Sequence, residues 1–485
     1  MVKAARCTLF LLMVTISLFC GCSSDSGAPA GNSFSAVVFS DIHFNPFYDP
    51  TLFTALNSSA VELWPDIFKG SSVQSVSVRG SDTNYPSLVM ALSGIKQNAG
   101  TASLIIFTGD MLGHSLTETF YKNYAKDPTH PTPEDVVAMK AFTDKIVAFI
   151  MNQIRLSVGS IPVMFAIGNS DSYSLIDDGA NKSFRENTAG YFYTKFLNST
   201  VDQQTFLSTF KSGGYYSAEP AGTNLVVIGL DTVPFTNNLQ NTQATDELTW
   251  LETKVAAAKA GGKKVWLLMH VPPGANIDGA ASSVDVNGHS TTTPASMMWD
   301  TSSNYQERFL TIFAANPGVI TLTLAAHTHM DEFRVMTSSD VLEITPGITP
   351  YFGNNPAFKV FTFAKESLKP TDYRSVYYDL GSMPDTFNDY YTFSHRYAMQ
   401  GPSLNDSLIS VSNAFDTNNF YKSAYAIGYN SGNSSLTPDP YSNTHSYTPV
   451  ITQPSQVTPY MNWPVFSCGA KFINQTDFYN CVKPQ

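Results

Sequence analysis

Cysteine is scarce in this chain of 485 residues, and it is unevenly placed. Three of the five cysteines lie within the first 22 residues, and only Cys468 and Cys481 lie beyond them. At most one disulfide can therefore form within residues 23–485. In an exported protein, a pair this close in sequence is expected to form a disulfide that fastens the C-terminal tail, and the alternative is two buried thiols.

A basic excess and long apolar runs are missing as well. The chain has 28 Lys and Arg against 39 Asp and Glu, which gives a net charge of −11. This charge argues against a nucleic-acid partner, because such a partner requires a basic stripe. After residue 22 no run approaches about 18 uninterrupted apolar residues, so that part of the sequence predicts no membrane-spanning helix.

The one long apolar run lies at the N-terminus. Lys3 and Arg6 precede "CTLFLLMVTISLFCGC", a basic and then apolar order that predicts a secretory signal at residues 1–21. The end of this run, Phe19 to Cys22, resembles the lipobox of bacterial lipoproteins, with Cys22 as the lipidated residue before a small-residue linker at 22–33. We therefore expect export to a bacterial cell envelope or periplasm, and otherwise plain secretion.

Short apolar runs recur along the next 300 residues. Six of them have the length of strands and are apolar on both faces, namely 35–40, 103–108, 162–167, 224–230, 264–269 and 320–326. Residues 134–155 and 245–260 carry apolar side chains at helical spacing. This alternation predicts an α/β fold in which helices cover a sheet. After about residue 366 the chain turns rich in Tyr, Ser and Asn, which favours a smaller, partly helical subdomain at 366–485.

Side chains that can bind metals follow directly after these runs. They are two aspartates, one asparagine and four histidines: Asp41, His43, Asp110, Asn169, His270, His327 and His329. The carboxyl ends of strands in an α/β sheet open on one crevice, where ligands bind. A lone histidine is more often a satisfied core residue, but the whole ordered set predicts a metal centre, since imidazoles and carboxylates suit Zn²⁺, Fe or Mn²⁺.

The motifs "DIH", "GD", "GN", "H" and "HTH" occur in that order and resemble those of the calcineurin-like metallophosphoesterases. The resemblance implies a β-sandwich flanked by helices and a centre of two divalent ions, Zn²⁺ first, with Fe or Mn²⁺ as alternatives. Carried over to this sequence, Asp41, His43 and His329 would hold one ion. Asn169, His270 and His327 would hold the other, and Asp110 would bridge both.

Longer motifs are similar to those of the acid sphingomyelinase-like branch of that family. They are "FSDIHFNPFYDP", "HVPPG", "HTHMDEF" and "ITPGITPYFGNNPAFKVF", and with them the resemblance covers residues 34–365. No six-cysteine saposin-like module precedes this region, so we expect small soluble substrates of the nucleotide type, with phosphocholine-type diesters as the rival class. A monomer is expected, with membrane contact only through a lipid anchor or a lipid substrate.

Ser170 raises the question of proton donation. Many relatives have Gly-Asn-His where this chain has Gly168-Asn169-Ser170, and a serine is no general acid near neutral pH. The branch carries a histidine four residues after the bridging aspartate, which here is His114, so we predict that His114 assists the leaving group. Its alternative is a surface loop residue. Asp171 is expected either to orient a ligand or to cap the next turn, and Asn354 either to form a loop or to line the cleft.

The sequence therefore predicts an exported two-metal hydrolase of phosphodiester or phosphoanhydride bonds. Two alternatives stay open. The first is a phosphomonoesterase, which would share the ligands and differ in cleft shape. The second is a lipoprotein that binds metal without turnover.

Overall fold

The computed structural model describes residues 32–173, 182–198, 200–239, 241–282, 296–398, 401–433 and 463–482. The predicted signal and Cys22 lie outside the described residues. Within these ranges, none of the helices combines the length and apolarity needed to cross a bilayer.

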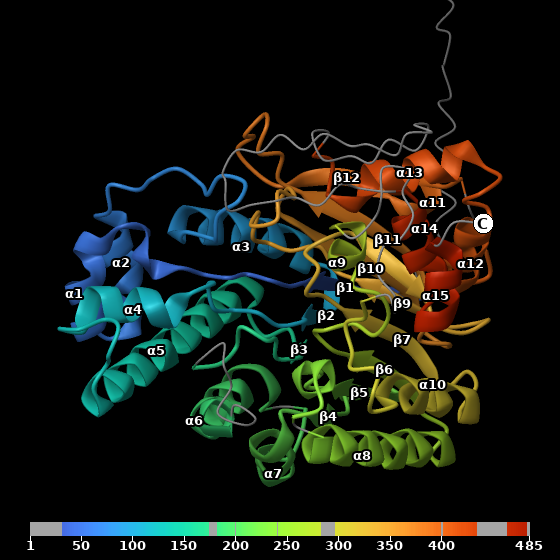
Figure 1. Ribbon diagram of the computed structural model, residues 1–485, viewed down its shortest axis with the longest axis horizontal. Coiled ribbons are helices and arrows are strands. Elements are labelled where there is room, and N and C mark those ends of the chain that lie inside the picture. The colour runs from blue at the N-terminus through green and yellow to red at the C-terminus, as the bar shows by residue number, and fades with distance from the viewer. Residues whose placement is uncertain are drawn as a thin grey trace, which may run out of the picture.

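Twelve strands in the described residues form two six-stranded sheets (Figure 1). The first has the order β12-β11-β10-β1-β2-β3, and the second has the order β4-β5-β6-β7-β9-β8. Their bounds are β1 Ser33–Phe39, β2 Ala102–Phe107, β3 Val163–Phe165, β4 Tyr216–Ala218, β5 Leu225–Gly229, β6 Lys264–Leu268, β7 Ile320–Ala325, β8 Glu332–Val335, β9 Val341–Ile344, β10 Ala357–Ala364, β11 Pro370–Tyr377 and β12 Asn388–Thr392. All six predicted strands are confirmed.

The predicted strands form the parallel centre of each sheet. Strands β1, β2 and β3 run parallel, as do β5, β6 and β7, and β9 continues the second sheet in parallel beside β7. The other outer strands pair antiparallel with their neighbours. The parallel strands are almost wholly buried, which explains their apolar character on both faces. Because parallel strands end at one edge, the loops that follow them meet there.

The two sheets pack face to face. The ring of Trp266 on β6 lies 4.3 Å from that of Phe363 on β10 and 6.0 Å from that of Phe34 on β1, measured between centroids. Trp266 is fully buried, and its indole nitrogen donates to the carbonyl of Leu368. The predicted β-sandwich is confirmed.

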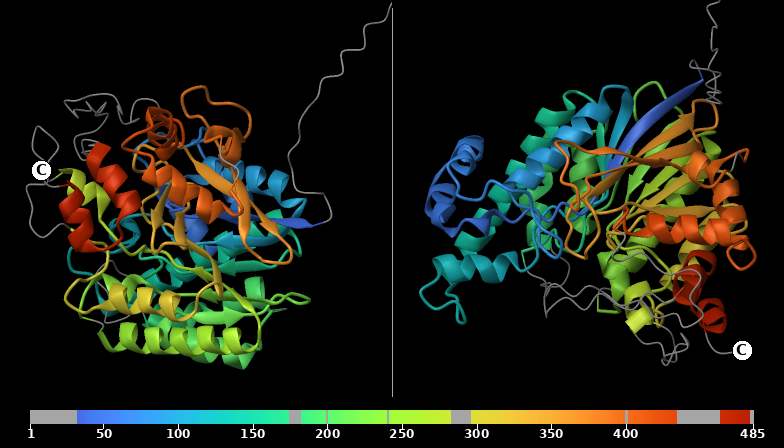
Figure 2. Two further views of the ribbon diagram at one scale, coloured as in Figure 1. Left: turned by 90° about the vertical axis from the view of Figure 1, so that its right-hand side faces the viewer. Right: turned by 90° about the horizontal axis from the view of Figure 1, so that it is seen from above.

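Helices lie outside the sheets (Figures 1 and 2). Helices α3 and α5 lie beside the first sheet, and α8 and α10 lie along the second. The bounds are α1 Phe53–Ser58, α2 Trp64–Lys69, α3 Tyr85–Ala99, α4 Leu116–Tyr124, α5 Pro133–Val158, α6 Lys182–Phe192, α7 Gln203–Gly213, α8 Asn241–Ala260, α9 Ile277–Ser282, α10 Tyr305–Ala315, α11 Phe393–Arg396, α12 Leu404–Asn413, α13 Asn419–Tyr429, α14 Trp463–Lys471 and α15 Gln475–Val482.

Both predicted helices are confirmed, as α5 and α8. Helix α5 begins with a capping box, in which Thr132 and Asp135 satisfy each other's backbone N–H groups. It ends at Val158, and the next residue, Gly159, has a φ of 63° that a residue with a side chain would adopt only at a cost.

The C-terminal part is helical, as predicted, and also contributes two strands. Strands β11 and β12 extend the first sheet, so the predicted boundary after residue 365 falls in the hairpin between β10 and β11. Helices α12 to α15 lie at the opposite end of the molecule from α1, α2 and α4 (Figures 1 and 2). Cys468 of α14 and Cys481 of α15 are joined by a disulfide, with their Cα atoms 5.9 Å apart.

Candidate metal centre

The loops after five parallel strands bring the predicted ligands to one place. Oδ2 of Asp110 lies 3.2 Å from Nε2 of His43 and 3.1 Å from Nε2 of His270, so this carboxylate stands between two imidazoles. Oδ1 of Asp41 lies 3.5 Å from Nε2 of His329 and 3.8 Å from Nε2 of His270. Segments from distant parts of the sequence therefore share one cluster.

The backbone is strained at this cluster. Five of the ligand candidates have φ in the left-handed region: Asp41 (49°), His43 (43°), Asp110 (61°), His327 (74°) and His329 (63°). For residues with a side chain this conformation costs about 1–2 kcal/mol each. Hydrogen bonds between the loops hold it, such as those from Asp41 N to Gly109 O (2.9 Å) and from His43 N to Asp110 O (3.1 Å).

Gly168 leaves space for the central carboxylate. A Cβ atom at this position would lie 2.0 Å from Oδ1 of Asp110. The glycine of the "GN" motif is therefore required by the close approach of two loops.

Two histidines are held by backbone carbonyls. Nδ1 of His43 lies 3.0 Å from the carbonyl of Leu112, and Nδ1 of His270 lies 2.7 Å from that of Thr108. Since a carbonyl only accepts, each Nδ1 carries the hydrogen, and Nε2 faces the carboxylates. Metal-binding histidines are commonly fixed by such a second hydrogen bond.

Several buried polar atoms of the cluster have no hydrogen-bond partner in the described part of the chain. They are both carboxylate oxygens of Asp41, Nε2 of His43, Oδ1 of Asn169, Nε2 of His270 and Nδ1 of His329. Nε2 of His43 is close to Asp110 without the alignment of a hydrogen bond. Buried polar atoms are costly when unsatisfied, and oxygens and imidazole nitrogens are the atoms that divalent ions bind.

The cluster divides into two overlapping groups. Asp41, His43 and Asp110 offer ligand atoms within 4.8 Å of one another, and so do Asp110, His270 and His327. Asp110 belongs to both groups. The donor set thus fits two divalent ions, which the phosphoesterase resemblance implies, with one carboxylate between them.

Charges in the cluster favour protons on some groups and exclude them from others. Burial lowers the pKa of His327 to about 3, helped by the charge on His270, so His327 is neutral. Burial also lowers the pKa of His329 well below its usual range. Burial opposes a charge on His270 too, but the Asp110 carboxylate raises the pKa of His270 to about 9. Burial raises the pKa of Asp41 to about 7, against the lowering by His270.

Asp171 fixes the loop that carries Asp110. Its carboxylate accepts hydrogen bonds from the backbone N–H groups of Asp110 (2.9 Å), Met111 (2.8 Å) and Gly168 (2.9 Å). It therefore orients the central aspartate through the backbone.

Ser170 lies against the same aspartate. Its backbone N–H donates to Oδ1 of Asp110 at 2.8 Å. Its hydroxyl is buried and has no hydrogen-bond partner among the described residues. Asn354 is fully buried and donates from Nδ2 to the carbonyls of Gly347 and Thr349, while its Oδ1 has no hydrogen-bond partner among the described residues.

His114 lies beside the cluster. Its ring is stacked between those of His43 (4.1 Å) and Tyr351 (3.9 Å), and its side chain is 25% exposed. Nδ1 of His114 lies 2.6 Å from Oδ1 of Asp82, and its backbone N–H donates to Oδ2 at 2.9 Å. A ligand atom of His114 also lies within 4.8 Å of those of His43 and His329.

Asp82 and two aromatic residues next to the cluster are not among the site residues predicted from the sequence. Asp82 lies in a loop that follows no strand, and no motif marks it. Tyr351 and Phe352 belong to the "ITPYFGNN" motif, which was the available signal. Phe352 is 40% exposed and meets the ring of His329 edge-on at 4.6 Å.

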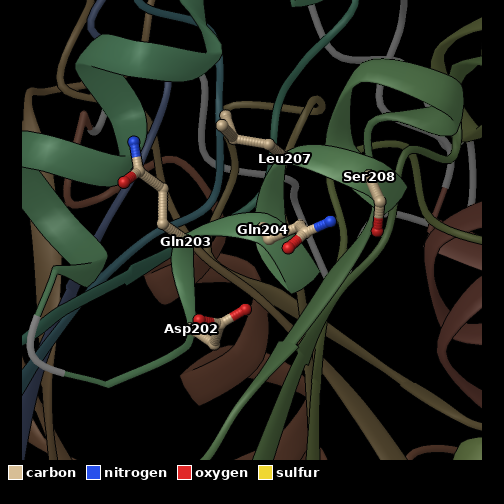
Figure 3. A pocket seen from close by; sticks show the side chains of 5 residues that line it. All are labelled: Asp202, Gln203, Gln204, Leu207 and Ser208. Carbon is tan, nitrogen blue, oxygen red and sulfur yellow. The ribbon is translucent and has the colours of Figure 1, made fainter.

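A surface depression of about 490 Å³ lies elsewhere, over the first turns of α7. Asp202, Gln203, Gln204, Leu207 and Ser208 line it (Figure 3). None of the candidate ligands takes part, so this depression has no link to the cluster.

Curated relatives of this chain carry phosphodiesterase names. "Sphingomyelinase phosphodiesterase C" of Dictyostelium discoideum is 24% identical over 325 residues, which cover 62% of this chain and 63% of that protein. "Sphingomyelinase phosphodiesterase D" of the same organism is 25% identical and covers 71% and 75%. "Cyclic GMP-AMP phosphodiesterase SMPDL3A" of Rattus norvegicus is 24% identical and covers 72% and 70%. The match thus spans less than two thirds of the first of these relatives.

A solved structure, a dimetal phosphatase from Danio rerio, aligns with a TM-score of 0.39 at 12% identity, covering 71% of this chain and 95% of that one. A TM-score this low carries no weight for the fold, which stands on the strand order. The family profile described as "Calcineurin-like phosphoesterase" matches residues 34–331, more than half of the sequence. The chain belongs to the calcineurin-like phosphoesterase family.

Proposed function

We propose that this protein is an exported two-metal phosphodiesterase that hydrolyses small soluble phosphodiesters or phosphoanhydrides. The observation that carries the proposal is the pair of overlapping ligand groups that share Asp110. All of these residues except the partly exposed His327 are buried, and several of their ligand atoms lack a partner in the described chain.

The proposed ligand sets follow the family resemblance, and the two groups that share Asp110 support them. Asp41, His43 and His329 would hold one ion, Asn169, His270 and His327 would hold the other, and Asp110 would serve both. Zn²⁺ is the proposed metal because imidazole nitrogens and carboxylate oxygens suit it. Fe and Mn²⁺ are the alternatives, since they bind the same ligands. When bound, two such ions activate water and neutralise charge on a phosphoryl group.

His114 supplies the proton in this proposal. Nδ1 of His114 donates a hydrogen bond to the Asp82 carboxylate and keeps its hydrogen. The exchangeable proton is therefore the one at Nε2. As water oxygen bonds to phosphorus, the bond from phosphorus to the leaving oxygen breaks, and the proton of Nε2 passes to that oxygen. Ser170 is not the proton donor in this proposal. Its hydroxyl, which has no partner in the described part of the chain, would donate a hydrogen bond to a phosphoryl oxygen.

The substrate class follows from the relatives' names. Some are named for sphingomyelin and others for cyclic GMP-AMP, and both are phosphodiesters. We propose nucleotide-type substrates first and phosphocholine-type diesters second. The predicted signal and lipobox support export as a lipoprotein whose anchor is Cys22, and a monomer is proposed.

A titration of metal-stripped residues 23–485 tests the proposal. Two ions of Zn²⁺ or Mn²⁺ are expected to bind per chain, and hydrolysis of a cyclic dinucleotide is expected to appear as they bind. Phosphocholine release from sphingomyelin vesicles under the same conditions would favour the second class. Two bound ions with no hydrolysis of either substrate would favour a metal-binding protein without turnover.

A further inference from the structure

Asn355 is a fully buried side chain at which three distant segments meet. Its Oδ1 accepts hydrogen bonds from Nη2 of Arg79 at 2.7 Å and from the backbone N–H of Leu380 at 3.2 Å. Its Nδ2 donates to the carbonyl of Ser431 at 3.1 Å, and its backbone N–H donates to that of Asn430 at 3.3 Å.

The first of these segments carries the partner of His114. Arg79 lies three residues before Asp82, whose carboxylate is bonded to His114. Hydrogen bonds from Gly80 N to Pro350 O (2.9 Å) and from Thr83 N to His43 O (3.1 Å) hold this loop on either side. The hydrogen bond from Arg79 to Asn355 thus helps to hold the part of the loop that leads to Asp82.

The loop that carries Asn355 itself also carries the ring on the other side of His114. Tyr351 stacks on His114 at 3.9 Å and lies four residues before Asn355. Nδ2 of Asn433 donates to the carbonyl of Gly353 at 2.6 Å, so the turn after α13 holds this loop a second time. Asp82 and Tyr351 both contact His114. The loops that carry them are therefore both connected to the C-terminal part of the chain by hydrogen bonds at Asn355 and at the nearby Gly353.

Only a primary amide serves all of these partners. Its oxygen accepts from a guanidinium and a backbone N–H while its nitrogen donates to a carbonyl. Aspartate would keep the acceptor for Arg79 and lose the donor to Ser431, and alanine would lose both.

We infer that Asn355 is a positioning residue for His114, through which the C-terminal part of the chain sets the geometry of proton donation. This inference rests on the proposed role of His114. It assigns no contact with substrate or metal to Asn355. A proton donor displaced by about 1 Å can cost about 100-fold in rate, so a remote amide can control turnover.

Asn355→Ala tests the inference with two diesters that differ in leaving group. Bis-p-nitrophenyl phosphate releases a stable anion, whereas diphenyl phosphate needs a proton on its leaving oxygen. We expect kcat for diphenyl phosphate to fall about 10-fold or more, and kcat for the nitrophenyl ester to change less, as for a weakened general acid. Asn355→Asp is expected to lie between wild type and Asn355→Ala.

A double-mutant cycle separates positioning from general damage. If Asn355 acts through His114, then His114→Ala with Asn355→Ala is no slower than His114→Ala alone. Losses that multiply, or a drop in bound metal measured by mass spectrometry, would overturn the inference. The matched control is Asn98→Ala, since Oδ1 of Asn98 also accepts from an arginine, Nη2 of Arg374 at 2.6 Å, and Asn98 lies on α3. Asn98→Ala is expected to leave kcat for both substrates unchanged.

Hydrogen exchange supplies a readout that does not depend on turnover. In Asn355→Ala the amides of residues 77–84 and 347–353 are expected to exchange faster together, while those of β1 and β2 stay protected. Unchanged exchange in either loop would contradict the inference even if the wild type hydrolysed neither ester. If the wild type hydrolysed neither ester but both loops exchanged faster in Asn355→Ala, the result would refute the proposed function and not the link between Asn355 and these loops.

Discussion

Oδ1 of Asp82 lies 2.6 Å from Nδ1 of His114, although the two residues belong to separate loops. The same carboxylate accepts the backbone N–H of His114, so it fixes both the ring and the chain that carries it. Nδ1 of His114 is thus occupied by Asp82, and in the proposed function Nε2 is the nitrogen that protonates the leaving group.

Asp82→Asn is expected to lower kcat for diphenyl phosphate by about 10–100-fold while the bound metal stays at wild-type level. Asparagine keeps the shape of aspartate, but it removes the charged acceptor and can present an N–H group to Nδ1, which favours the wrong tautomer of His114. Asp127→Asn is the matched control, because Asp127 pairs with His130 at 3.2 Å in an exposed loop. Equal kcat in Asp82→Asn and wild type would argue against this role of Asp82.

Gly168→Ala is expected to lower both metal content and activity, the latter by about 100-fold. The new Cβ would lie 2.0 Å from Oδ1 of Asp110, so the central carboxylate must move. Metal content by mass spectrometry and turnover of bis-p-nitrophenyl phosphate measure the effect. Gly190→Ala on α6 serves as control, because a Cβ atom at that position would meet nothing within 4 Å. Full metal occupancy in Gly168→Ala would contradict the geometry.

Metal affinity is expected to rise with pH. In the metal-free protein the Asp110 carboxylate outweighs burial and raises the pKa of His270 to about 9, so a metal ion must displace a proton from His270 below that pH. Burial raises the pKa of Asp41 to about 7, so a second proton must leave below pH 7. The slope of log affinity against pH should be near one between about pH 7 and 9 and steeper below 7. Calorimetry in buffers of different ionisation enthalpy counts the released protons, and a count of zero at pH 6 would refute this prediction.

Replacing both Cys468 and Cys481 by serine is expected to lower the free energy of unfolding by about 3 kcal/mol. The disulfide closes a loop with a sequence separation of 13 and joins α14 to α15. Chemical denaturation measures the loss. A reductant should destabilise the wild type by a similar amount and leave the double variant unchanged. Equal unfolding midpoints for wild type and variant under oxidising conditions would rule out a stabilising role.

The clustering of the candidate ligands could be predicted from sequence because each of them follows a buried strand. Asp41, Asp110 and His270 come shortly after runs whose apolar character marks them as central parallel strands. Once the strands are parallel, their ends share an edge, and the residues that follow must meet. The same apolar runs predict the six central strands, and the helical spacing of apolar residues predicts the two long helices.

The support behind the ligands could not be predicted. Asp82 and Asn355 make their hydrogen bonds to residues of distant loops, and neither periodicity nor a turn motif marks such bonds. Asp171 was expected to orient a ligand or cap a turn, and only the structure shows that it accepts three backbone N–H groups around Asp110 and Gly168. Strands β11 and β12 were not predicted because their tyrosine-rich sequence lacks the fully apolar pattern of the central strands.

Hydrolysis of bis-p-nitrophenyl phosphate against p-nitrophenyl phosphate tests the central claim most directly. Residues 23–485 would be stripped of metal and resupplied with Zn²⁺ or Mn²⁺. The account predicts that activity is absent without metal, returns with it, favours the diester, and is lost in Asp110→Asn. Metal-restored activity that favours the monoester would indicate a phosphomonoesterase, and no activity on either ester with any metal would contradict the two-metal phosphodiesterase.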